Sequence, residues 1–126
     1  MREIFVTITG LSHYLGAKPF KVDRVVKLTK ERDNEFDSDA IMVELPYVDT
    51  IGYVANSPYT VYEGTVSAGR LYDMIGDRAL ARVMFITHSS VIAKLLTEEE
   101  VRKLKNPEEN FYKISDDLAS SENTAL

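Results

Sequence analysis

Apolar and polar positions alternate in several short runs along the first 96 residues of the chain. Six runs have the length and the β-branched composition of strands, namely residues 3–9, 24–30, Ile41–Leu45, 50–54, 80–86 and 89–96. Five or six strands of this length form a small barrel or a curled sheet. We therefore predict a mainly β fold of the α+β class, a small barrel of about six strands closed by a helix.

Two helices are expected between and after these strands. The first begins at Ser57 and Pro58, because Ser can cap the free amides and Pro fits the first turn. Its apolar stripe would comprise Tyr59, Val61, Tyr62, Val66, Leu71 and Met74. Gly64 and Gly69 weaken this helix, and Gly76 is expected to end it. The second helix spans residues 97–104, where Thr97 precedes three acids, and Pro107 ends it.

The composition fits one domain followed by a tail. A chain of 126 residues, 44% hydrophobic and 28% charged, is long enough for one core and too short for two. We expect residues 1–96 to form the barrel domain. Residues 97–126 are expected to form a short helix and an acidic, mobile tail, because little after Ser115 can be buried.

Redox and targeting features favour the cytoplasm. The chain has no cysteine, which excludes a disulfide framework and a thiolate metal site. Residues 1–10 form a strand-like run without a cleavage region, and no apolar run approaches the length needed to span a membrane. We expect a cytoplasmic protein with no membrane partner.

The net charge of −5 is distributed unevenly. Residues 1–95 carry 11 Lys and Arg against 12 Asp and Glu, whereas residues 96–126 carry 4 against 8. The acidity of the whole chain therefore does not exclude a nucleic-acid partner for the body. The body contains a basic cluster, comprising Lys18, Lys21, Arg24, Lys27, Lys30 and Arg32. This cluster is either a solvated strand face or a phosphate-facing patch, and the sequence favours neither.

An acidic segment with one aromatic residue connects the second and third predicted strands. Residues 31–39 contain five acids, together with Asn34 and Phe36, and Asp and Asn are typical turn formers. Phe36 either folds back to plug the core or stands out as a stacking platform, and the sequence favours the plug. The acids also match the register of a calcium loop, but Ser38 stands where that loop needs Gly, and a strand follows instead of a helix. We therefore expect no metal.

The sequence gives little support for catalysis. His13 and His88 are the only histidines, and no Cys is present as a nucleophile. Neighbouring residues on a strand face opposite ways, so the Ser12-His13 and Thr87-His88 pairs form no catalytic arrangement. The glycine-rich segment at residues 10–16 lacks the Lys of a phosphate-binding loop. We expect neither enzymatic activity nor a cofactor.

Three blocks carry a resemblance to a known family. They are G-L-S-H-Y-L-G at residues 10–16, D-N-E-F-D-S-D-A-I-M-V at residues 33–43, and I-G-Y-V-A at residues 51–55. In this order they resemble the HIRAN domain, a small β-rich module found at the N-terminus of certain fork-remodelling translocases and as a stand-alone bacterial protein. The resemblance extends over about residues 3–95.

The resemblance implies an OB-like barrel that holds the 3′ end of single-stranded DNA. By that resemblance Asp37 accepts a hydrogen bond from the terminal hydroxyl, Phe36 is one stacking ring, and Asn34 reads a base edge or braces the turn. His13 takes the place of the other stacking ring, with Tyr14 packed beside it. An aromatic ring can stack on any base, and a carboxylate can accept a bond from a free hydroxyl.

The same resemblance places Tyr53 and Asn56 along the groove near the phosphates, with Gly16 making a turn. Two positions depart from the family, because Ser12 stands in place of an Arg and Asn56 lies near the position of a Lys. Two phosphate contacts are thereby put in doubt. Each aromatic or polar residue also has a structural interpretation. Asn34 and Asp37 could cap the turn, and Tyr14 and Tyr53 could fill the core, which is the interpretation we favour for Tyr14.

Three hypotheses follow. The first is a non-catalytic module that binds single-stranded DNA ends in DNA repair or at replication forks, alongside a separate helicase or nuclease, and it predicts strong salt dependence. The second is a protein-interaction module that has lost DNA binding, which the missing Arg and the acidic tail favour. The third, an enzyme using clustered carboxylates and magnesium, ranks last.

Overall fold

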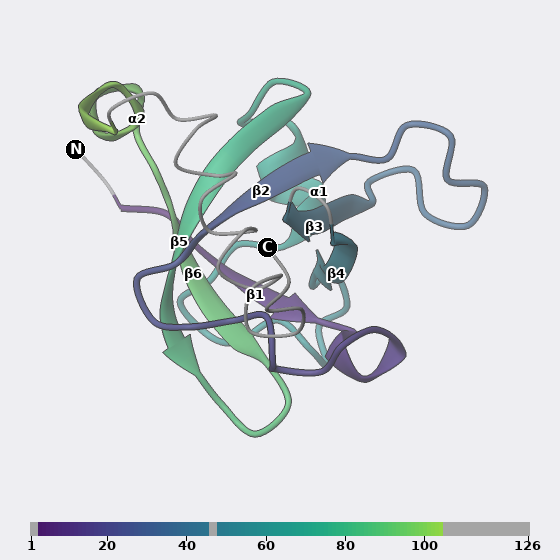
Figure 1. Ribbon diagram of the computed structural model, residues 1–126. Helices are drawn as coiled ribbons and strands as arrows, with labels where there is room; N and C mark the ends of the chain where they lie inside the picture. Colours follow the sequence, from purple (N-terminus) through teal and green to yellow (C-terminus); the bar gives the residue numbers. More distant parts are fainter. Residues whose placement is uncertain (1–2, 46–47, 105–126) are drawn as a thin grey trace.

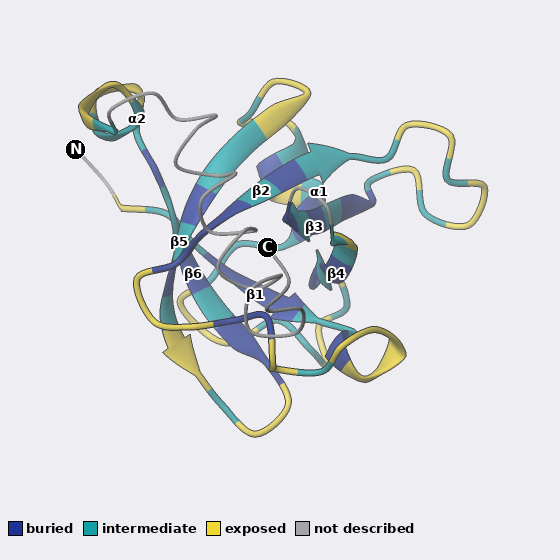
Figure 2. Cartoon of the chain, in the orientation of Figure 1, coloured by how far each residue is buried: buried dark blue, intermediate teal, exposed yellow. Residues whose placement is uncertain are grey.

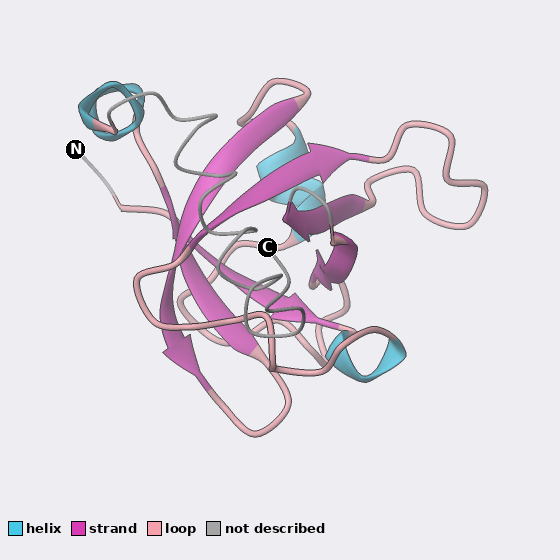
Figure 3. Cartoon of the chain, viewed as in Figure 1, coloured by secondary structure: helices cyan, strands magenta, loops and turns pink. Residues whose placement is uncertain are grey.

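The computed structural model describes residues 3–45 and 48–104, and its strands enclose a barrel (Figure 1). The strands are β1 (Phe5–Thr9), β2 (Val25–Lys30), β3 (Ile41–Leu45), β4 (Asp49–Val54), β5 (Arg78–Ile86) and β6 (Val91–Leu95). A 3-10 turn η1 (Leu11–His13), helix α1 (Ala68–Tyr72) and helix α2 (Glu98–Lys103) complete the described elements. In Figure 3 the helices are short, and α2 lies apart from the strands.

The barrel closes in the order β1-β4-β3-β2-β5-β6, with every neighbouring pair antiparallel. β1 completes the ring because it pairs with β4 on one side and with β6 on the other. All six predicted strands are confirmed, with ends shifted by no more than two residues. The predicted fold, a six-stranded barrel with helices, is also confirmed.

The core lies inside the barrel and follows the alternation of the sequence. In β3, Ile41, Val43 and Leu45 are buried, and the residues between them are only partly covered (Figure 2). Ala68 and Leu71 of α1 are fully buried in the same hydrophobic cluster. The helix therefore contributes to the core, as expected for a barrel that a helix closes.

The prediction of a helix running from Ser57 to a stop at Gly76 is wrong for most of its length. Only Ala68–Tyr72 is helical, with Ser67 as the N-cap, whose Oγ accepts a hydrogen bond from the backbone of Arg70. Asp73 is the C-cap, so the helix ends before Gly76, which lacks the positive φ of a glycine stop.

Contacts with β1 account for the missing helix. The amide of Val66 donates to the carbonyl of Phe5 at 2.8 Å, and the hydroxyls of Thr7 and Thr65 lie 2.8 Å apart. Gly64 adopts a φ of 92°, which ends any right-handed helix there. The segment therefore covers the outer face of β1 instead of coiling on itself.

The predicted second helix is confirmed. Thr97 and Glu100 form a capping box, in which each side chain accepts a bond from the other residue's backbone amide. Pro107 and the predicted mobile tail lie outside the described residues. No helix within the described ranges is long and apolar enough to cross a membrane.

Candidate functional site

The segment between β2 and β3 is a turn that projects from the barrel (Figure 1). We call residues 31–40 the acidic turn. Its two ends are joined where the amide of Glu31 donates to the carbonyl of Ala40 at 2.9 Å. The turn is therefore closed at its base, and its tip is presented to solvent (Figure 2).

Asn34 organises the tip of the acidic turn. Its Oδ1 accepts hydrogen bonds from the amides of Phe36 and Asp37, both at 2.8 Å, and its Nδ2 donates to Oε1 of Glu31 at 2.7 Å. Both ends of the side-chain amide are thus engaged inside the protein. Asn34 braces the turn, which was one of its two predicted roles.

Phe36 is 97% exposed, so the favoured interpretation of this residue as a core plug is wrong. The amides held by Asn34 fix the backbone at the tip, away from the barrel. The interior is already filled by aliphatic side chains, among them Leu28 and Ile41, which are fully buried. An exposed ring on a braced backbone can stack against a flat ligand without first being uncovered.

Asp37 directly follows Phe36 in the sequence and has one carboxylate oxygen available. Its Oδ1 accepts a hydrogen bond from the amide of Asp39 at 2.9 Å, which stabilises the turn. Its Oδ2 has no hydrogen-bond partner among the described residues. Asp37 therefore caps the turn and can also accept a hydrogen bond from a ligand.

Tyr14 and Tyr53 add two aromatic rings to the site, with centroids 6.3 Å apart and planes at 37°. Tyr14 is 41% exposed, so the favoured interpretation that it fills the core is wrong. It follows η1 on the surface, while Tyr53 belongs to the barrel wall. The contact between the rings connects the segment after β1 to β4.

The hydroxyl of Tyr53 donates to Glu31, whose Oε1 and Oε2 lie 2.9 Å and 3.0 Å away. Burial, followed by the hydrogen bond to the Glu31 carboxylate, raises the pKa of Tyr53 well above its ordinary value. Tyr53 therefore remains a neutral hydrogen-bond donor at physiological pH.

Glu31 is the residue that the sequence analysis missed. It accepts hydrogen bonds from both Asn34 and Tyr53, so it joins the acidic turn to the barrel wall. One signal was present, since Glu31 precedes Asn34 by three residues at the start of the turn, a spacing at which two polar side chains can meet.

The other two predicted residues, His13 and Asn56, belong to the segments that follow β1 and β4. His13 is exposed at the end of η1, directly before Tyr14. Asn56 follows β4, and its Oδ1 accepts a hydrogen bond from the amide of Gly69 at 2.8 Å. Asn56 thus helps to hold the start of α1. Gly16 has a φ of 67°, as expected of a glycine that makes a turn.

Several cations of the basic cluster are engaged within the protein. Arg24 is buried and donates to the carbonyl of Pro19 at 3.0 Å. Lys30 donates to the carbonyl of Ile75 and lies 4.3 Å from the centre of the Tyr72 ring.

The remaining members of the cluster have mixed surroundings. Arg32 donates from Nε to Asp77 at 3.0 Å in an exposed ion pair. Lys18 and Lys27 also make interactions, and Lys21 is exposed. The basic cluster was interpreted either as a strand face or as a phosphate-facing patch. For Arg24, Lys30 and Arg32 these contacts favour a structural role over contact with phosphates.

The carboxylates of the acidic turn do not assemble a metal site. In the described ranges 3–45 and 48–104, no three His, Asp or Glu side chains are grouped closely enough to hold an ion. Exposed Asp33 and Glu35 flank Asn34 and Phe36 instead. The carboxylates near the ring therefore give the tip a negative potential.

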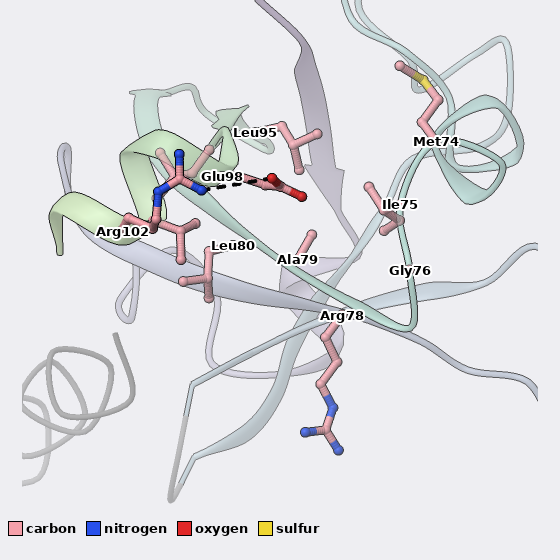
Figure 4. Close-up of a pocket in the computed structure, with 11 residues that line it drawn as sticks. Met74, Ile75, Gly76, Arg78, Ala79, Leu80, Leu95, Glu98 and Arg102 are labelled. Atoms are coloured by element: carbon pink, nitrogen blue, oxygen red, sulfur yellow. Dashed lines mark ion pairs between the residues drawn. The ribbon is translucent and has the colours of Figure 1, made fainter. Parts of the chain in front are cut away.

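A separate cavity of about 480 Å³ lies between α2 and strands β5 and β6 (Figure 4). Its walls are mostly aliphatic, and Glu98 and Arg102 form an ion pair at 3.9 Å on one side. Arg78 points away from the other lining side chains in Figure 4. None of the predicted site residues lines this cavity.

Comparison with known proteins supports the barrel fold and the family resemblance. The model of the HIRAN domain matches residues 1–58, a range that contains all three sequence blocks. A protein from Lactobacillus plantarum shares 23% identity at a TM-score of 0.52, covering 75% of this chain and 93% of its own. The HIRAN domain of human HLTF shares 17% identity at a TM-score of 0.52, covering 89% of this chain and 88% of its own.

No curated protein matches the chain. At these identities the two structures show that they share a barrel fold with this chain. The family match shows, in addition, that the sequence of the first 58 residues resembles the HIRAN domain. The resemblance to the HIRAN domain family that the sequence blocks carry is confirmed over residues 1–58.

Proposed function

We propose that this protein is a non-catalytic module that binds the 3′ end of single-stranded DNA. One observation carries the proposal, namely that the acidic turn exposes 97% of Phe36, and that the next residue in sequence, Asp37, has a carboxylate oxygen without a partner among the described residues. A ring alone would bind any base, and a carboxylate alone would bind any donor. Together they suit the last nucleotide of a strand.

The binding mode follows from the two groups. The terminal base stacks on Phe36, and each stacked base contributes about 1–3 kcal/mol in single-strand binding proteins. The 3′ hydroxyl donates to Oδ2 of Asp37, the oxygen that has no partner in the described residues. Tyr14 and His13, both exposed, offer a surface for the preceding base.

The charge of the acidic turn supports selection of an end rather than of a long strand. Asp33, Glu35 and Asp37 disfavour a phosphate at the tip, whereas an uncharged hydroxyl is accepted. A strand that ends in a 3′ phosphate would bring two negative charges against these carboxylates. The module should therefore discriminate between the two ends.

Fluorescence anisotropy at low salt tests the proposal. A labelled single strand with a 3′ hydroxyl is compared with the same strand carrying a 3′ phosphate, for the wild type, Asp37→Asn and Asp33→Asn. We expect the wild type and Asp33→Asn to prefer the hydroxyl end. Asp37→Asn should lose that preference, because Asn can still accept from Asp39 but no longer offers a carboxylate. Equal affinity of the wild type for both ends would refute end recognition.

We further propose that residues 1–96 are the binding domain of a cytoplasmic protein that acts in DNA repair or at replication forks, alongside a separate helicase or nuclease. A β-barrel with an exposed ring on the acidic turn supports binding, and the described residues contain no group of His, Asp or Glu side chains that could hold a metal ion for bond cleavage. Pull-down with a 3′-ended strand in the presence and absence of such a partner would test the association.

The second candidate function is a protein-interaction module on the same fold. The bonds of Arg24 and Lys30 to backbone carbonyls and the exposed ion pair of Arg32 with Asp77 favour it, because fewer unpaired cations remain for phosphates. It predicts no binding to either strand at any salt concentration. That result in the anisotropy experiment would move the proposal to this candidate.

A further inference from the structure

Glu31 occupies the junction between the two halves of the candidate site. On one side it accepts from Nδ2 of Asn34 at 2.7 Å, and Asn34 in turn holds the amides of Phe36 and Asp37. On the other side it accepts from the hydroxyl of Tyr53, whose ring contacts Tyr14. A continuous chain of contacts therefore runs from Phe36 to Tyr14 through one carboxylate.

We propose that Glu31 is a positioning residue, which sets the ring of Phe36 and the carboxylate of Asp37 relative to the rings of Tyr53 and Tyr14. It does so through its hydrogen bonds and not through its charge. The proposal concerns the geometry of the acidic turn itself, and its binding readout rests on the proposed function.

The charge of Glu31 and its hydrogen bonds predict opposite effects on binding, which makes the two separable. A carboxylate close to a polyanion weakens binding, so removal of its charge alone should tighten binding. Loss of the link to Asn34 should weaken binding, because the tip would no longer be held for stacking. The sign of the change therefore identifies the role.

Two substitutions use this difference. Glu31→Ala and Glu31→Gln remove the same charge, but Gln keeps an oxygen at the position of Oε1, which accepts from both Asn34 and Tyr53. If Glu31 acts by position, Ala weakens binding to the hydroxyl-ended strand roughly five- to tenfold, the effect of one or two lost hydrogen bonds. Gln should bind at least as tightly as the wild type.

Glu44 provides the matched control. It is a carboxylate on β3 that accepts from the hydroxyl of Thr29 at 2.6 Å, and it has no bond to Asn34 or Tyr53. Glu44→Ala removes one charge and one hydrogen bond from the same barrel, outside the chain of contacts. We expect it to change affinity by less than about twofold. Thermal unfolding of each variant shows that the protein tested is folded.

Nuclear magnetic resonance provides a readout that needs no ligand. The amides of Phe36 and Asp37 should shift and lose protection from hydrogen exchange in Glu31→Ala, and should be unchanged in Glu31→Gln and Glu44→Ala. Unchanged amides in Glu31→Ala would overturn the positioning role, whatever the protein binds. If the amide signals change in Glu31→Ala but the wild type binds neither the hydroxyl-ended nor the phosphate-ended strand, the positioning role stands and the proposed function is refuted. Equal tightening by Ala and Gln would also overturn the proposal, since it would show that only charge matters.

Discussion

Two turns of this protein expose an aromatic ring almost completely, Phe36 at 97% and Tyr59 at 96%. Each ring follows a polar residue that accepts a hydrogen bond from its amide. Asn34 accepts from Phe36 at 2.8 Å, and Ser57 accepts from Tyr59 at 3.1 Å. Local turn chemistry is therefore the same in both places.

The turns differ in the further hydrogen bonds of that polar residue. Asn34 donates to Glu31, which accepts in turn from Tyr53 in the barrel wall. The hydrogen bonds of Ser57 stay within its own turn, to residues 59–61. The neighbours also differ, because Phe36 is followed by the carboxylate of Asp37 and Tyr59 by Thr60. The comparison indicates that an exposed ring becomes a candidate site only when its turn is braced against the barrel and a carboxylate follows the ring in sequence.

The largest expected effect comes from disturbing the packing of β4 next to Tyr53, the residue that contacts Glu31 of the acidic turn. A Cβ on Gly52, next to Tyr53, would lie 2.9 Å from Cγ2 of Ile8 and 3.0 Å from the carbonyl oxygen of Thr9. Gly52→Ala should therefore lower the free energy of unfolding by about 3 kcal/mol, because the backbone oxygen cannot move aside cheaply. Gly76→Ala meets no atom within 4 Å and should change it by less than about 1 kcal/mol. Chemical denaturation of both variants measures the difference, and similar values would contradict the close approach.

Substitution of Phe36 and of Tyr59 tests directly whether the two exposed rings differ in function. Phe36→Ala should weaken binding to a hydroxyl-ended single strand by about 2 kcal/mol, the contribution of one stacked base. Tyr59→Ala removes a ring of equal exposure and should leave the affinity unchanged. Both variants should unfold at the wild-type temperature, because neither ring is buried. Anisotropy gives the affinities, and an equal loss in the two variants would show that bracing is irrelevant.

Substitution of the two polar residues compares the turns themselves. Asn34→Ala removes three hydrogen bonds and should lower the free energy of unfolding by about 1.5 kcal/mol. Ser57→Ala removes a single bond to Tyr59 and should cost about 0.5 kcal/mol. Urea denaturation measures both. A larger cost for Ser57→Ala would mean that the acidic turn is the less firmly held of the two.

The sequence predicted the barrel well because strand burial depends on local alternation. Ile41–Leu45 shows this, since its pattern of apolar residues is also its pattern of burial. The helix expected from Ser57 failed for a non-local reason. Its apolar stripe was real, but the bond from Val66 to Phe5 joins residues 61 positions apart, and no local pattern reveals it.

Most residues of the candidate site were named from the sequence, whereas Glu31 and the arrangement of the site were not. The acidic turn and its Asn were evident from composition, and the family blocks supplied the two tyrosines. The exposure of Phe36 was missed because apolar residues are usually buried, and only the brace by Asn34 explains why this one is not. Glu31 was missed because its partner Tyr53 is 22 residues away in sequence.

The last prediction concerns the hydroxyl of Tyr53, whose contribution to stability should depend on pH. Tyr53→Phe removes the bond to Glu31 and should cost about 1 kcal/mol near neutral pH. Because folding raises the pKa of Tyr53 above its ordinary value of 10.0, the protonated phenol is favoured in the folded state. This contribution is fully present below pH 10.0 and is lost as the pH rises through the higher pKa of the folded protein. The difference in unfolding free energy between the wild type and Tyr53→Phe should therefore be constant at neutral pH and shrink at about pH 11. Urea denaturation at the two pH values measures it, and a difference that grows with pH would show that Glu31 does not hold the phenol in its neutral form.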